Sequence, residues 1–171
     1  FDAKGFLTAS LAEPNPVLYF EHKYLYRSLE GLVPDEYYTL PIGVARVARA
    51  GAEATIVTYG WAVHWALEAV ERIGRDVEVI DLRSLQPWDR DTVYASVRKT
   101  GRVLVLTEDT LTGSFASEVA ASIGQDCFAS LDAPVLRLGS LDTPVPFNGR
   151  LEQDFLARTR LASTLEELLS Y

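Results

Sequence analysis

Residues 102–123, RVLVLTEDTLTGSFASEVAASI, decide the fold of this chain. The stretch begins with a continuous apolar run at residues 103–106, which is typical of a strand buried on both faces of a parallel sheet. After a polar turn the apolar spacing becomes helical, with Phe115, Val119 and Ile123 on one face. A buried strand that leads into an amphipathic helix is half of a βαβ unit.

The same alternation of strand and helix recurs along the chain. We expect an edge strand within residues 42–49, further strands at residues 54–59, 77–82 and 134–138, and helices at residues 61–73, 90–99, 113–124 and 163–171. Strands separated by a helix suit right-handed crossovers between parallel neighbours. The sequence therefore predicts an α/β fold, a three-layer sandwich with a mostly parallel sheet of about five strands.

The first residues of the chain have a different character. Residues 2–13 have helical spacing with Asp2 as the expected cap, prolines follow, and residues 17–21 favour a short strand. The chain contains no methionine, so we interpret it as a piece of a longer protein. We expect three divisions: residues 1–27 as the end of a preceding domain, 28–52 as a linker with the edge strand, and 53–171 as the main domain.

Two local signals concern the last part of the chain. Residues 139–158 contain Pro144 and Pro146, and we expect them to be irregular. Ser163 followed three residues later by Glu166 fits a capping box, which predicts that the last helix begins there.

Composition excludes several classes of protein. The net charge is −8 with no basic block, which argues against a nucleic-acid or anionic membrane surface and leaves room for a basic protein partner. A single cysteine excludes an internal disulfide and fits a reducing compartment, so we predict a cytoplasmic location. No apolar run approaches the roughly 20 residues needed to span a membrane.

No complete catalytic set is visible in the residues themselves. The sequence has no glycine-rich phosphate cradle and no nucleophile elbow. Cys127 is interpreted as a packed residue, His64 as a helix residue, and the acid pair Glu108–Asp109 as a solvated strand end, each with a catalytic alternative. Arg83 is expected to pair with a carboxylate. A proton-transfer role is the minor alternative for His22, which follows the expected strand at residues 17–21.

Several motifs together resemble one family. The run DLRSLQPWD at residues 81–89, LTGSFASE at residues 111–118 and LDTPVP at residues 141–146 resemble landmarks of the β subunit of thiamine-diphosphate-dependent 2-oxo acid dehydrogenases. Upstream, DAKG at residues 2–5, Asn15–Pro16, Phe20–Glu21 and Leu25–Arg27 match the end of its pyrimidine-binding domain. The resemblance covers nearly the whole chain and is closer to the branched-chain 2-oxoisovalerate dehydrogenase type.

The resemblance implies a transketolase-type C-terminal domain from about residue 40 onward. The parent enzyme would decarboxylate a 2-oxo acid on thiamine diphosphate and magnesium and pass the acyl group to a lipoyl arm. The GDG…N motif and the activating glutamate of that family are missing here. We therefore assign no catalytic or cofactor-binding residue, and expect the fragment alone to be inactive and to bind no thiamine diphosphate.

The resemblance also implies partners and one metal. The expected partners are the enzyme's own α part, a second β copy through this domain in a heterotetramer, and the subunit-binding domain of the acyltransferase, with Tyr171 as a contact. A structural potassium ion would be held at Ser10, Glu13 and Asn15, largely through carbonyl oxygens.

Two alternatives stay open at this stage. The chain could be the C-terminal domain of a transketolase or a deoxyxylulose-phosphate synthase, which share the fold. It could also be a free-standing binding or assembly module without an enzymatic parent.

Overall fold

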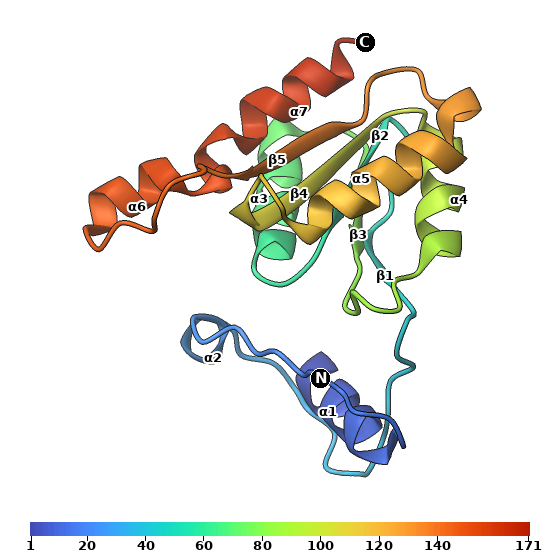
Figure 1. Cartoon of the computed structure of the whole chain (residues 1–171), viewed down its shortest axis with the longest axis vertical. Helices are drawn as coiled ribbons and strands as arrows, with labels where there is room; N and C mark the ends of the chain where they lie inside the picture. The colour runs from blue at the N-terminus through green and yellow to red at the C-terminus, as the bar shows by residue number, and fades with distance from the viewer.

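The computed structural model describes residues 1–171 and has two parts (Figure 1). Residues 1–41, here called the N-terminal unit, carry two helices and no strand. The remaining residues form the sheet domain, in which helices cover both faces of one sheet. Figure 1 shows the N-terminal unit below the sheet domain, joined to it by an extended piece of chain.

The sheet has five strands in the order β1-β3-β2-β4-β5. Their bounds are β1 Arg46–Arg49, β2 Ala54–Thr58, β3 Val77–Asp81, β4 Val103–Thr110 and β5 Leu136–Ser140. Edge strand β1 pairs antiparallel with β3, whereas all other pairs are parallel. This confirms the predicted fold class, including the edge strand within residues 42–49.

Seven α-helices and two short 3₁₀ helices accompany the sheet. Their bounds are α1 Asp2–Ala12, α2 Leu25–Ser28, α3 Ala62–Ile73, α4 Arg90–Thr100, α5 Phe115–Asp126, η1 Phe128–Ser130, α6 Gly149–Phe155, η2 Ala157–Arg160 and α7 Leu161–Leu169. Helices α3 and α7 pack on one face of the sheet, and α4 and α5 on the other. None of these helices combines the length and the apolar character that crossing a membrane requires.

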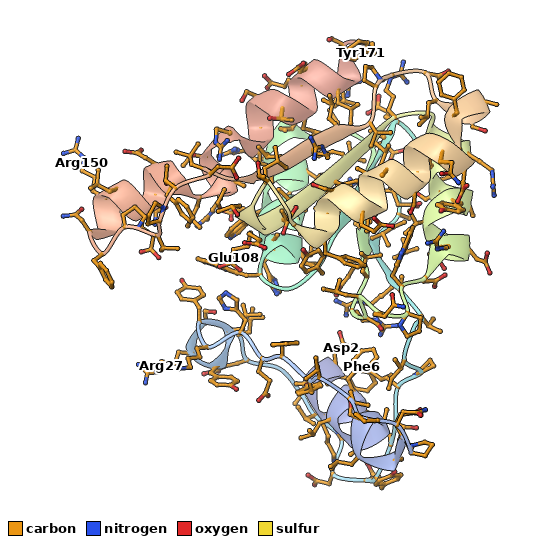
Figure 2. All side chains as sticks on the ribbon, in the orientation of Figure 1. Asp2, Phe6, Arg27, Glu108, Arg150 and Tyr171 are labelled. Atoms are coloured by element: carbon orange, nitrogen blue, oxygen red, sulfur yellow. The ribbon has the colours of Figure 1, made fainter.

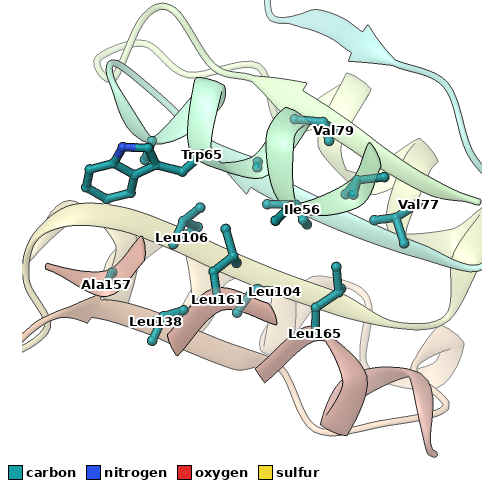
Figure 3. Packing of buried hydrophobic residues seen from close by; sticks show 14 of the residues in the cluster. Ile56, Trp65, Val77, Val79, Leu104, Leu106, Leu138, Ala157, Leu161 and Leu165 are labelled. Carbon is teal, nitrogen blue, oxygen red and sulfur yellow. The ribbon is translucent and has the colours of Figure 1, made fainter. Parts of the chain in front are cut away.

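Each face of the sheet contributes to its own apolar core. Figure 3 shows the first core, in which Ile56, Leu104 and Val79 face Trp65 of α3 and Leu165 of α7. These side chains are almost completely buried. The second core lies between the strands and helices α4 and α5. Burial on both faces explains the continuous apolar run at residues 103–106 of β4.

A buried polar network lies beneath α4 in the second layer. The Glu78 carboxylate accepts hydrogen bonds from Ser96 Oγ and from Lys99 Nζ, both at 2.5 Å, and Ser96 Oγ lies 2.7 Å from Thr55 Oγ1. Burial of the Glu78 carboxyl acts to raise its pKa, but the hydrogen bonds from Lys99 and Ser96 outweigh burial and hold the pKa below its ordinary value. The network therefore favours an ionised glutamate inside the fold.

Local signals predicted several helix ends correctly. Helices α3 and α4 end at Gly74 and Gly101, whose φ angles of 70° and 67° lie in the left-handed region that glycine adopts without strain. Asp89 caps α4, because its carboxylate accepts a hydrogen bond from the Thr92 N–H at 3.0 Å.

Other local predictions were wrong. Residues 17–21 form no strand, and Asp2 lies inside α1 and forms no cap hydrogen bond. Strand β4 continues to Thr110, through the acids that the sequence placed in a turn, because Thr110 pairs with Ser140 of β5.

The last part of the chain also differs from the prediction. Helix α6 interrupts the stretch expected to be irregular, and its cap is Asn148, which accepts hydrogen bonds from two N–H groups. The capping box at Ser163 does not form, because α7 begins at Leu161 and Ser163 Oγ donates to the carbonyl of Arg160.

We predict that Glu78→Gln lowers the free energy of unfolding by about 1–2 kcal/mol at pH 7, because one charged hydrogen-bond acceptor is lost. A carboxyl whose pKa is depressed by folding stabilises the fold above its unfolded pKa of about 4.3, and this stabilisation is lost as the pH falls through the folded pKa. The difference between the variant and the wild type should therefore shrink at pH 3.5. Urea unfolding followed by tryptophan fluorescence measures it. Glu71→Gln on the exposed surface of α3 is the control and should change the free energy of unfolding by less than about 0.5 kcal/mol. A loss of stability in Glu78→Gln that is the same at both pH values would contradict the prediction.

Candidate functional site

The carboxyl ends of the parallel strands meet at one edge of the sheet. In open α/β sheets, ligands usually bind outside this edge. Here the N-terminal unit lies along it: in Figure 2, Asp2 and Phe6 point from α1 toward the sheet domain, and Glu108 lies at the edge that faces the N-terminal unit. Two groups of contacts join the unit to the edge.

The first group contains two of the sequence candidates. His22 Nε2 lies 3.0 Å from Glu108 Oε1 and 2.9 Å from Oε2, although the residues are 86 positions apart in the chain. Both side chains are half-buried, with 30% and 33% of their surface exposed. The other ring nitrogen, Nδ1, is buried and has no hydrogen-bond partner.

Aromatic side chains surround the same contact. The Trp61 ring, at the start of α3, lies 4.4 Å from the Tyr24 ring and 5.4 Å from the His22 ring, measured between centroids. Trp61 also meets Trp65 edge to face at 4.9 Å. Such tilted and edge-to-face pairs are favourable arrangements of aromatic rings. This cluster was not predicted from the sequence, although the two tryptophans, Trp61 and Trp65, stand four residues apart at the start of α3.

A small cavity of about 190 Å³ lies next to the aromatic cluster. One wall comes from α2 and the residues beside it, and the other comes from α3, with Arg158 of η2 at its side. Arg158 donates to both carboxylate oxygens of Glu68, at 3.0 and 2.7 Å. The His22–Glu108 ion pair and the aromatic contacts of Trp61 thus form an interface between the N-terminal unit and the sheet domain.

The second group of contacts is a cluster of charges below β1 and β3. The Asp2 carboxylate lies 3.2 Å from the Arg46 guanidinium and 3.5 Å from that of Arg83. Arg46 also binds Asp81 at 3.2 Å, and the Arg83 guanidinium lies 5.2 Å from the centre of the Phe6 ring. Burial raises the pKa of Asp81, although Arg46 acts against this. The prediction that Arg83 pairs with a carboxylate is confirmed.

The remaining candidates do not join the His22–Glu108 pair. Asp109 is exposed to solvent, whereas Glu108 of the same expected acid pair is half-buried and binds His22. Burial, followed by the charge of Arg46, lowers the pKa of His64, which lies at the wall of the cavity. Cys127 is 2% exposed and burial raises the pKa of its thiol, as in a packed residue.

The residues predicted for potassium lie at the end of α1. Ser10 Oγ donates to the carbonyl of Phe6 at 2.7 Å, and Asn15 Nδ2 donates to Glu13 Oε1 at 2.7 Å. Their side chains are thus engaged with the protein. The backbone is different: Pro14 and Pro16 stand four residues after Ser10 and Ala12, and proline has no N–H to offer to a helical carbonyl. These carbonyl oxygens are suitable ligands for a hard cation.

Tyr171 lies at the end of the molecule farthest from the N-terminal unit, as Figure 2 shows. It is 55% exposed and follows α7 directly. Helix α7 is fixed to the sheet by Leu161, Leu165 and Leu168, which are almost fully buried. The chain end is therefore presented to solvent by a rigid element.

This arrangement contains no complete reactive centre. No three His, Cys, Asp or Glu side chains come together as a metal site. His22 is paired with a carboxylate, but no hydroxyl or thiol nucleophile is bonded to it, as a nucleophile–base arrangement requires. The edge is best described as a contact between two parts of a protein.

Comparison with known proteins places this geometry in a family. The model of the family described as "Transketolase, C-terminal domain" matches residues 43–160. Over the whole chain, the sequence is 43% identical to the 2-oxoisovalerate dehydrogenase subunit beta of Bacillus subtilis (strain 168) and 40% identical to the pyruvate dehydrogenase E1 component subunit beta of Cyanidium caldarium. It covers 54% and 53% of these relatives, so the chain spans about half of their length.

A solved structure agrees with the sequence relatives. The chain superimposes on a split-gene transketolase, solved as an inactive beta4 tetramer, with a TM-score of 0.66 and 28% identity over 83% of this chain and 46% of that one. The family match covers well over half of this chain, and the five-stranded sheet with helices on both faces agrees with it. The chain belongs to the family of transketolase C-terminal domains.

Proposed function

We propose that this chain is the C-terminal part of the β subunit of a 2-oxo acid dehydrogenase. That component decarboxylates a 2-oxo acid oxidatively and transfers the acyl group to lipoamide. The observation that carries the proposal is the alignment of the whole chain, at 40–43% identity, with β subunits of such enzymes. The split-gene transketolase supports the fold but is less similar in sequence, which makes a transketolase or a deoxyxylulose-phosphate synthase the second choice.

The cofactors of the parent enzyme do not fit the residues of this chain. Thiamine diphosphate supplies the carbanion for decarboxylation and needs a metal to hold its diphosphate. The chain offers neither a cluster of metal-binding side chains nor the family's GDG…N motif. We therefore propose that the cofactor is held by other parts of the parent.

The proposed role of this part is assembly. The expected partners are the α part, a second β copy in a heterotetramer, and the subunit-binding domain of the acyltransferase. Several large apolar side chains around α6 are exposed, as partner surfaces require: Leu141, Val145, Phe147 and Leu151. A cytoplasmic location belongs to the same proposal, and the lone, buried Cys127 supports it because it forms no disulfide.

We also propose that the end of α1 holds a potassium ion in the parent enzyme. The ligands would be carbonyl oxygens of Ser10, Glu13 and Asn15: that of Ser10 has no helical N–H partner because of Pro14, and Glu13 and Asn15 lie just beyond the end of α1 at Ala12. The carbonyl end of a helix also carries partial negative charge, which favours a cation. Further ligands would come from parts of the parent outside this chain.

The first test is an assay of the full-length parent. We expect it to consume branched-chain 2-oxo acids with thiamine diphosphate, magnesium and a lipoylated acceptor, in preference to pyruvate and 2-oxoglutarate. Two relatives with different substrates, the 2-oxoisovalerate and pyruvate dehydrogenase subunits of Bacillus subtilis, are both 43% identical to the chain, so the assay decides between them. A parent that turns over none of the three substrates, but transfers ketol groups between sugar phosphates, would favour the transketolase alternative.

Residues 1–171 alone serve as the control for this assay. The isolated chain should show no turnover, and calorimetry should detect no heat of thiamine diphosphate binding. Tight binding of the cofactor to the isolated chain would contradict the proposed division of roles.

A second test concerns the chain end. Deleting Ser170 and Tyr171 from the parent should weaken its binding to the acyltransferase subunit-binding domain by at least about tenfold, or about 1.4 kcal/mol. The buried leucines of α7 remain, so the fold should be kept. Calorimetric titration measures the affinity, and Asp91→Asn on α4, on the opposite face of the sheet, should leave it unchanged. Equal affinity of the deletion variant and the wild type would remove Tyr171 from the docking surface.

A third test concerns potassium. Exchange of sodium for potassium at constant ionic strength should raise the melting temperature of the parent, because a bound ion stabilises the folded state. Pro14→Ala offers an N–H to the carbonyl of Ser10 and should reduce this rise, whereas Pro34→Ala in a loop should not. Identical melting in the two salts would count against the site.

A further inference from the structure

We propose that residues 81–89, here called the clamp loop, hold the chain just before β1 and make residues 41–43 the pivot between the N-terminal unit and the sheet domain. Arg83 is the main positioning residue of this loop, and Asp89 assists it from the other end. The clamp loop coincides with the motif DLRSLQPWD, to which the proposed function assigns no role. The inference goes beyond that function and holds whichever reaction the parent catalyses.

Arg83 has a backbone conformation that is rare for an arginine. Its φ angle of 57° lies in the left-handed region, and it is the one residue other than glycine with a positive φ. This region costs conformational energy for a residue with a Cβ, so such a residue persists where the surrounding structure holds it. The Arg83 N–H donates to Asp81 Oδ1 at 3.2 Å, which supports the turn at the end of β3. From this turn the Arg83 side chain reaches the chain before β1.

The Arg83 guanidinium binds the backbone directly before β1. It donates to the carbonyl of Val44 at 3.0 Å and to that of Ala45 at 3.3 Å, and only 12% of the side chain is exposed. Asp89 binds the same stretch, because its Oδ2 accepts a hydrogen bond from the Ala45 N–H at 2.9 Å. Side chains of the clamp loop thus bind backbone groups of two consecutive residues. Figure 1 shows this loop, between β3 and α4, beside the chain that leads into β1.

Gly43 permits the close approach of this chain to the clamp loop. Its φ angle is 85°, a conformation that glycine adopts without strain. A Cβ atom at this position would lie 2.9 Å from Pro87 Cγ, which is closer than two carbon atoms can approach without displacement. The chain before β1 therefore packs directly against the clamp loop, in addition to the hydrogen bonds from Arg83 and to Asp89.

The attachment of the N-terminal unit ends just before the attachment of the sheet domain begins. The Leu40 N–H donates to the carbonyl of Gly5 in α1 at 3.1 Å, so residue 40 moves with the N-terminal unit. Residues 44–45 move with the sheet domain, because the clamp loop binds them. A change of angle between two rigid parts is absorbed by the backbone dihedrals of the few residues between them. Here these are residues 41–43.

The test is hydrogen–deuterium exchange of the full-length parent, followed by mass spectrometry with fragmentation that resolves single amides. In the wild type, exchange should be fast at Ile42 and Gly43 and slow at Ala45, whose N–H is bound to Asp89. Equally slow exchange at all three amides would overturn the assignment of the pivot.

Two substitutions of Arg83 test the clamp loop itself. Arg83→Ala should raise the exchange rate of residues 44–49 about tenfold, because two hydrogen bonds to their backbone are lost, while β2 and β4 keep the protection of the wild type. Arg83→Gly removes the same side chain but suits the left-handed backbone, so it should raise exchange equally and keep a higher melting temperature than Arg83→Ala. The glycine variant therefore separates the loss of these bonds from unfolding.

Two control variants separate the clamp loop from other effects of charge. Asp2→Asn removes the carboxylate of α1 that lies 3.5 Å from the Arg83 guanidinium, and it should leave the exchange of residues 44–49 unchanged. Arg72→Ala removes an exposed arginine of α3 that forms no ion pair, and it should also have no effect. Wild-type protection of residues 44–49 in Arg83→Gly, or an equal rise in Asp2→Asn, would overturn the proposal.

Discussion

The burial of β2 on both faces is the constraint on which the rest of the structure depends. All five of its residues, Ala54–Thr58, are buried, and β3 and β4 flank it in parallel. A strand without a solvated face needs a helical layer on each side, and parallel neighbours need crossovers that supply those helices. The same geometry brings the carboxyl ends of the strands together at one edge, where the polar residues Asp81 and Glu108 stand.

That edge is covered by the protein's own chain. His22 binds Glu108, and Asp2 binds Arg46, so the N-terminal unit occupies the side where α/β sheets usually accept ligands. The charged side chains at this edge are already paired with one another, unlike those of an open ligand-binding cleft. This pairing supports the proposed role of the chain in assembly.

The sequence predicted those strands and helix ends that depend only on burial or on the conformation of a single residue. The continuous apolar run at residues 103–106 indicated β4, and Gly74 ends α3 because glycine adopts a left-handed conformation without strain. The strand expected at residues 17–21 does not form in residues 1–171, because a strand needs a neighbour with which to pair and residues 1–41 contain no other strand. The His22–Glu108 contact was beyond sequence reasoning: each residue was singled out separately, but 86 positions and a change of domain lie between them.

Strand β4, which reaches the carboxyl edge of the sheet, and helix α7, which precedes Tyr171, pack in the same apolar core. Glu108, which meets the N-terminal unit, lies in β4, the strand whose Leu104 packs in the same core as Leu165 of α7. Close-packed interiors resist gradual deformation, so the chain end after α7 keeps a fixed position relative to the carboxyl edge. Residues 22–29 lack such packing, since their contacts with the sheet domain are the His22–Glu108 ion pair and the Tyr24–Trp61 ring contact. Movement in this protein is therefore expected first at the joint between its two parts, while the sheet and the helices that cover it move as one body.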